Sequence, residues 1–198
     1  MTTFKRSTLA AALAALTFGL SASADNGKED NFRARLSGFN EVHFIAAPTP
    51  ALRGAVSTRA SGSFRAEIDD KHDTIDYTLT YGDLEGVVTQ AHIHFGQRHT
   101  PGGIVVWLCQ TAAVPAPAAV AAVTPICPGP SAGTVTGTIN PAQVLDVVGQ
   151  GIAAGEFEEL VRAIRAGITY ANVHSTLFPP GEIRGQLRHG GRGHDHHD

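Results

Sequence analysis

Three histidines stand at positions whose spacing suits metal coordination. His92 and His94 are two residues apart in the segment AHIHF, and His174 lies in a later segment, YANVHS. Alternate side chains of an extended strand share a face, so the first two imidazoles point to the same side of their strand. Imidazole is a good ligand for both zinc and copper. If the two segments are neighbouring strands, the three rings predict a transition-metal site.

Polar residues on the same predicted faces either complete such a site or replace it. Asn172 shares a face with His174, and Glu182 and Arg184 share a face of the segment that follows. Glu182 would complete or orient a metal site, and Arg184 is expected to form an ion pair with a neighbour. The same side chains also suit a structural hydrogen-bond network without metal. The sequence leaves both alternatives open.

Alternating apolar and polar residues predict that the elements carrying these side chains are short strands. About eight such runs are separated by Gly, Pro and Asp. This pattern predicts a mostly β fold, an antiparallel β-sandwich or Greek-key barrel. One or two short helices interrupt it: residues 156–167 repeat apolar positions with helical spacing and end at Gly167, and Asn140-Pro141 is typical of a helix start. The predicted strands lie in residues 32–36, 62–69, 74–81, 87–95, 104–108, 133–139, 168–175 and 182–187.

The same segments resemble a known family. The motifs AHIHFG, NVHS and GEIRGQL occur in this order, preceded by LSGFNEV, and together they are similar to the CHRD domain, named from chordin. The resemblance runs from about residue 35 to residue 187. It implies an extracellular β-sandwich, immunoglobulin-like or superoxide-dismutase-like, and no established reaction. The Pro/Ala-rich stretch 114–130 is longer than in the simplest members of the family.

The two ends of the chain differ from the middle. Residues 1–24 have a basic start, a short apolar run and a small-x-small site after Ala24, which predicts a cleaved signal peptide and a secreted or periplasmic protein. No later segment is long and apolar enough to anchor the chain in a membrane. Residues 25–34 are expected to be flexible, with the domain over 35–188. Residues 189–198 read as a disordered tail, in which His194, His196 and His197 would capture metal loosely.

Two cysteines, Cys109 and Cys127, are the only ones in the chain. In an oxidising compartment such a pair is expected to form a disulfide. Their spacing is far from Cys-x-x-Cys, which argues against a thiolate metal site. No free thiol nucleophile would then remain.

Charge and motifs narrow the function. The formal net charge is −3 and no basic stripe follows the sequence, which argues against nucleic acid or an anionic membrane as partner. No Gly-x-Ser-x-Gly motif and no phosphate-binding loop is present. We therefore expect an exported, non-enzymatic module that binds a protein or a metal ion, or serves a structural role. The alternative is a copper-dependent metalloenzyme of superoxide dismutase type, although the bridging histidine and zinc loop of those enzymes have no match here.

Overall fold

The computed structural model describes residues 30–45 and 52–190. The predicted signal peptide, residues 25–29 and the tail histidines 194, 196 and 197 lie outside the described residues. The elements in chain order are β1 (Asp30–Ser37), η1 (Gly38–Asn40), β2 (His43–Ile45), β3 (Leu52–Gly54), β4 (Ser61–Asp69), β5 (Thr74–Gly82), β6 (Val88–Phe95), β7 (Gly103–Cys109), α1 (Ala118–Ala121), β8 (Gly133–Ile139), η2 (Pro141–Gln143), α2 (Phe157–Arg165), β9 (Thr169–Ser175), β10 (Ile183–Gln186) and β11 (Arg188–His189).

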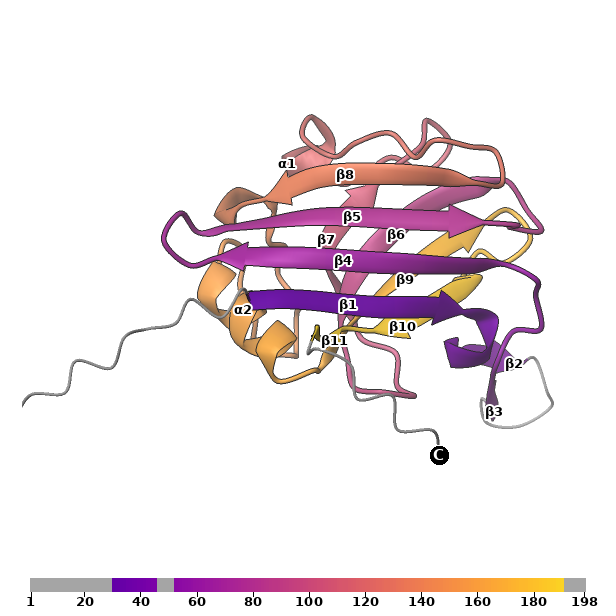
Figure 1. Ribbon diagram of the computed structural model, residues 1–198, viewed down its shortest axis with the longest axis horizontal. Helices are drawn as coiled ribbons and strands as arrows, with labels where there is room; N and C mark the ends of the chain where they lie inside the picture. Colours follow the sequence, from indigo (N-terminus) through magenta and orange to yellow (C-terminus); the bar gives the residue numbers. More distant parts are fainter. Residues whose placement is uncertain (1–29, 46–51, 191–198) are drawn as a thin grey trace, which may run out of the picture.

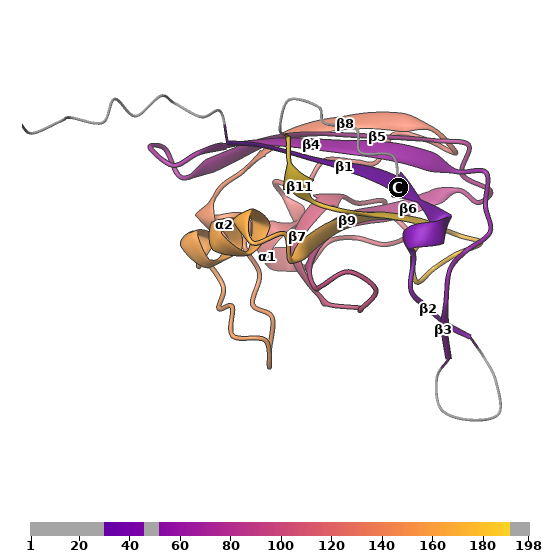
Figure 2. The ribbon, with the colours of Figure 1, turned by 60° about the horizontal axis from the view of Figure 1, so that its bottom comes forward.

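One continuous antiparallel sheet makes up most of the molecule. Its strand order is β7-β6-β9-β10-β1-β4-β5-β8, with β11 added beside β1. The sheet folds over on itself, so that β1, β4, β5 and β8 form one layer and β6, β7 and β9 lie in the other (Figures 1 and 2). The two layers are joined where β10 pairs with β1. The expected antiparallel sandwich or barrel is confirmed.

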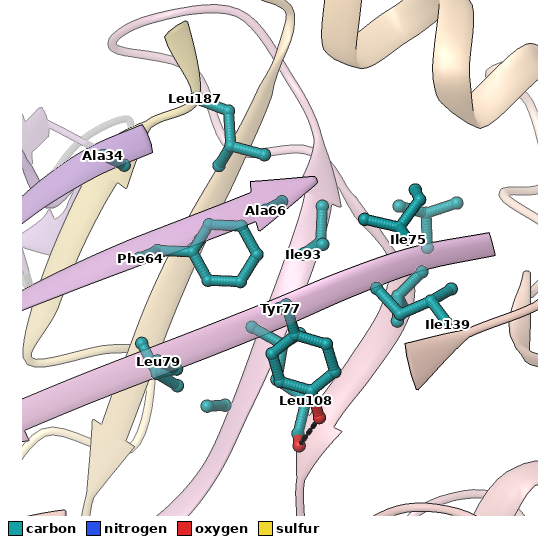
Figure 3. Close-up of a cluster of buried hydrophobic side chains, with 14 of the residues drawn as sticks. Ala34, Phe64, Ala66, Ile75, Tyr77, Leu79, Ile93, Leu108, Ile139 and Leu187 are labelled. Carbon is teal, nitrogen blue, oxygen red and sulfur yellow. Dashed lines mark hydrogen bonds between the residues drawn. The ribbon is translucent and has the colours of Figure 1, made fainter. Parts of the chain in front are cut away.

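Side-chain alternation explains why the sheet folds over. Strand β4 directs Phe64, Ala66 and Ile68 to one side, and β5 directs Ile75 and Leu79 to the same side, all of them buried. Strands of the other layer supply Ile93 and Leu108 to the same cluster (Figure 3). Burying the apolar faces of both layers against each other removes them from water, which is the main driving force for this arrangement.

Two contacts hold β7 to the layer it faces and to the segment leading into β8. The Tyr77 hydroxyl on β5 donates a hydrogen bond of 2.7 Å to the carbonyl oxygen of Leu108 on β7 (Figure 3). One residue later Cys109 forms a disulfide with Cys127, as the sequence predicts. The sheet is therefore cross-linked close to β7, which is one of its two open edges.

The helix predicted after residue 155 forms as α2. Its residues Phe157, Leu160, Val161 and Ile164 are buried, and Gly167 has φ +68°, which ends the helix in the left-handed conformation. The start predicted at Asn140 is the short helix η2, where the Asn140 side chain accepts a hydrogen bond from the amide of Ala142. The helix α1 in the Pro/Ala-rich stretch was not predicted.

Two expected boundaries need correction. Strand β1 begins at Asp30, and Phe32 and Ala34 are buried in the core, so residues 30–34 are not a flexible segment. At the other end, His189 belongs to β11, which pairs with Phe32 of β1, and is not part of a disordered tail. Both ends of the domain are fixed because they pair with each other, which local sequence patterns do not report.

Candidate metal centre

The histidines project from the outer face of the layer that contains β6 and β9. Ala91 and Ile93 of β6 are fully buried in the core, so His92 and His94 point to the opposite face, as alternation predicts. Strand β9 pairs with β6 in antiparallel register, with Gln90 opposite His174 and His92 opposite Asn172. This pairing brings His174 beside the two β6 histidines.

The three imidazoles converge on one place. One ring nitrogen from each of His92, His94 and His174 lies within 4.8 Å of the others. All three side chains are buried, with exposed fractions of 0%, 8% and 6%. The Nδ1 of His92 lies 3.1 Å from the Nε2 of His174, close to the ~3.3 Å that separates two nitrogens bound tetrahedrally to one zinc ion at 2.0–2.1 Å.

Backbone carbonyls fix the orientation of two of the rings. The Nδ1 of His94 donates to the Gly102 carbonyl (2.9 Å), and the Nδ1 of His174 donates to the Pro179 carbonyl (2.8 Å). Each bond assigns the proton to Nδ1 and leaves the Nε2 lone pair facing the cluster. Metal-binding histidines are usually held in this way.

The hydrogen bonds within the cluster do not satisfy all of its buried ring nitrogens. Because the Nε2 of His174 is an acceptor, His92 donates from Nδ1, and its own Nε2 then has no partner. The Nε2 of His94 is also buried and makes no hydrogen bond of good geometry, although the Asn172 side chain lies close enough to act on the pKa of His94. Buried nitrogen atoms of this kind are rare in folded proteins, since each costs about 1–3 kcal/mol.

The imidazoles are neutral at neutral pH. Burial lowers the pKa of His94 and of His174 to about 4, with further lowering at His94 from the charges of His174 and Arg184. Burial lowers the pKa of His92 well below its usual value as well. The neutral ring, with a free lone pair, is the form that binds metal ions.

Aromatic rings pack around the histidines. Trp107 on β7 lies opposite His92, edge to face, with ring centroids 4.3 Å apart. Tyr170 on β9 stacks on His94 with centroids 4.7 Å apart and planes 2° from parallel. Trp107 also packs against Ala116 and Val120, so the Pro/Ala-rich stretch covers this side of the cluster.

A sequence model of the CHRD domain matches residues 32–187. The chain belongs to the CHRD domain family. No curated protein and no solved structure matches the chain. In this CHRD domain the motifs AHIH and NVHS supply all three imidazoles, because they lie on the paired strands β6 and β9.

Another residue of a CHRD motif lies beside the cluster, although no role was expected for it from the sequence alone. Glu41, in the LSGFNEV segment, is buried, and burial raises its pKa to about 7 despite the opposing charge of Arg184 and hydrogen bonds from Val42 and Asn172. Its Oε1 would lie 2.6 Å from a Cβ at Gly181. The available signal was a charged residue within a family motif, but the burial of this loop residue after η1 is a tertiary property.

The three polar residues expected around the histidines take different places. Asn172 lies opposite His92 and interacts with Glu41 and His94. Arg184 donates from Nη2 to the Gln97 carbonyl and lies over the Tyr170 ring, and Glu41 is the carboxylate whose charge acts on it. Glu182 instead accepts through Oε1 from the Thr58 hydroxyl (2.8 Å) and the Glu85 amide (2.7 Å). The Oε1 of Glu182 is therefore hydrogen-bonded to two loops and not to the imidazoles.

Over the described residues, no helix of this CHRD domain is long and apolar enough to cross a membrane.

Proposed function

We propose that this CHRD domain is an exported, non-enzymatic binding module that holds one Zn²⁺ or copper ion between His92, His94 and His174. The observation that carries the proposal is the convergence of three buried ring nitrogens within 4.8 Å. A metal ion would take up the Nε2 atoms of His94 and His174 and one nitrogen of His92.

A hydrogen-bond network alone is the competing explanation, and the unpaired nitrogens argue against it. A network that existed only to lock strands together would satisfy its buried atoms. Here two ring nitrogens make no hydrogen bond of good geometry, while the carbonyls of Gly102 and Pro179 hold two rings with their lone pairs inward. This is the outer-shell arrangement that metal sites use.

Three protein ligands leave a tetrahedral ion with one open position. In a binding module that position would be filled by water or by a side chain of a partner protein. Export is supported by the signal-type sequence of residues 1–24 and by the Cys109–Cys127 disulfide, because such bonds persist mainly in oxidising compartments.

Metal analysis of the full chain tests the proposal. A background variant with His194, His196 and His197 changed to Ala removes capture by the tail. In that background we expect one equivalent of Zn²⁺ or copper by mass spectrometry after dialysis. His92→Gln and His174→Gln should each lower the metal affinity by at least tenfold. His72→Gln, at an exposed histidine bonded to Asp69, is the matched control and should bind like the background protein.

Stability provides a second measurement, which stays informative if a histidine variant binds no metal because it is unfolded. A ligand present at 100 times its Kd raises the free energy of unfolding by about 2.7 kcal/mol. The background protein should therefore gain stability on addition of Zn²⁺ or Cu²⁺, whereas a folded His174→Gln should not. A folded background protein that gains neither metal nor stability would falsify the site.

The superoxide dismutase alternative from the sequence uses the same three residues. Superoxide consumption by the copper-loaded background protein, lost in His92→Gln, would favour it. Metal binding without this activity supports the non-enzymatic module.

A further inference from the structure

The structure has a cleft of about 640 Å³ on the outer face of β1, β4 and β10, and none of the three clustered histidines lines it. Six arginines line it, and no acidic residue does within the described part of the chain. The arginines are Arg33, Arg35, Arg65, Arg98, Arg184 and Arg188. The chain as a whole is mildly acidic, so this concentration of positive charge is local and is created by the fold.

Strand register places three of these charges in one row. Arg33 of β1 lies directly opposite Arg65 of β4 on one side and Arg188 of β11 on the other. All three side chains are exposed, and Arg35 follows on the same face of β1. The register therefore concentrates positive charge on one face of the sheet, beside the other arginines of the cleft.

The acidic residues of the same sheet face lie elsewhere. Glu67 is two residues beyond Arg65 on β4 and pairs in register with Asp76 of β5. Both lie toward the β4–β5 hairpin and outside the cleft. The face is thus divided into an acidic end and an arginine-lined cleft, and the cleft is the part that would attract an anion.

Arg184 gives the cleft a fixed inner wall. Its exposed fraction is 3%, its Nη2 donates to the Gln97 carbonyl (3.0 Å), and its guanidinium carbon lies 3.3 Å from the centroid of the Tyr170 ring. The loop after β6, which carries Gln97, also supplies Arg98 to the cleft. A guanidinium held in this way loses little side-chain freedom when a ligand binds.

The size of the cleft and the number of its arginines indicate the kind of anion. At about 640 Å³ the cleft is much larger than one phosphate or sulfate. Its six arginines come from β1, β4, β10, β11 and the loop after β6. Guanidinium groups bind the oxygens of such anions in a bidentate manner, and the cleft is within the size range of small-ligand sites. We propose that this cleft binds an anion that carries two or more phosphate or sulfate groups.

Calorimetry on the full chain, freed of metal by a chelating resin, tests the proposal. The probes are tripolyphosphate, a fully sulfated disaccharide and orthophosphate. We expect tripolyphosphate or the sulfated sugar to bind at least tenfold more tightly than orthophosphate, with affinity falling as salt is raised. Binding of one of the two and not the other identifies a phosphate or a sulfate source. Equal affinity for orthophosphate would overturn the multivalent site.

Matched variants separate the cleft from net charge. Arg33→Gln/Arg65→Gln should weaken the tighter probe at least tenfold. Arg59→Gln/Arg162→Gln removes the same charge from exposed positions outside the cleft and should change affinity less than twofold. Equal loss in both variants, or no binding of any probe by the folded protein, would reject the proposal. Tighter binding to a short DNA duplex, lost in the cleft variant, would reject it in favour of a nucleic-acid surface. Because metal is absent throughout, the result is independent of the histidine site.

Discussion

The guanidinium carbon of Arg184 lies 3.3 Å from the centroid of the Tyr170 ring, and the same ring stacks on His94. Strand β9, which carries Tyr170, lies between β6 and β10, so the tyrosine stands between an imidazole of the candidate metal centre and an arginine of the cleft. Its hydroxyl also accepts a hydrogen bond from the amide of Gly102, whose carbonyl holds His94. Tyr170 is therefore a positioning residue for His94.

Two substitutions of Tyr170 should lower the metal affinity by different amounts. Tyr170→Leu removes both the stack and the hydroxyl, and we expect a loss of ~10–100-fold in affinity for Zn²⁺ or copper, as for other outer-shell residues. Tyr170→Phe keeps the stack and should lose less than tenfold. Titration with a competing chelator measures both, with circular dichroism to verify folding. Equal affinities in the wild type and Tyr170→Leu would contradict a positioning role.

Glu41 should make stability depend on pH in a defined direction. Burial raises its pKa from 4.5 to about 7, so the folded protein binds a proton that the unfolded chain has released in this range. The contribution of Glu41 to the free energy of unfolding therefore falls as pH rises from about 4.5 to 7 and stays low above that.

Glu41→Gln removes this titration. Between pH 5 and 8 the variant should gain stability relative to wild type by up to about 3 kcal/mol. Urea unfolding at several pH values measures the difference, in which the contributions of the buried histidines cancel. Parallel stability profiles for the two proteins would show that Glu41 is not desolvated in solution.

Reduction of the Cys109–Cys127 disulfide should lower stability without changing the fold. The bond closes a loop with a sequence separation of 18 residues. The chain-entropy estimate for such a loop is about 3 kcal/mol. Urea unfolding should show this loss in Cys109→Ser/Cys127→Ser, and the same loss in the reduced wild type. If reduction lowers stability in the double variant as well, the effect does not come from this bond.

Gly181 should tolerate no side chain. Its φ is +133°, and a Cβ there would lie 2.6 Å from the Oε1 of Glu41 and 3.1 Å from the Nδ2 of Asn172. We expect Gly181→Ala to cost about 2–4 kcal/mol in unfolding free energy, from backbone strain and overpacking together. Gly151→Ala is the matched control, because Gly151 has φ +85° but open space around it. The control should show the strain alone, about 1 kcal/mol. Equal losses of stability in the two variants would mean that Glu41 and Asn172 can move aside for a Cβ at Gly181 at little cost.

The sequence by itself determined the faces of the strands. A strand alternates its side chains with a period of two, so AHIHF was enough to place His92 and His94 together and opposite Ile93. The helix over 157–165 and its end at Gly167 also follow from local spacing and backbone preference. The disulfide followed from cysteine count and the expected compartment.

Tertiary structure decided what surrounds those faces. Alternation directs Glu182 and Arg184 to the same side of β10, but loops distant in sequence decide which partners they bind. Glu182 accepts a hydrogen bond from Thr58, and Arg184 donates to the Gln97 carbonyl and packs on the Tyr170 ring. Other loops also cover the histidine face, so a side that alternation marks as outward is buried. The arginine row depends on the pairing of β1 with strands whose positions are 32 and 155 residues away from Arg33, at Arg65 and Arg188. The register of such pairings is the one that buries the most apolar surface over the whole sheet. A local sequence pattern therefore cannot predict them.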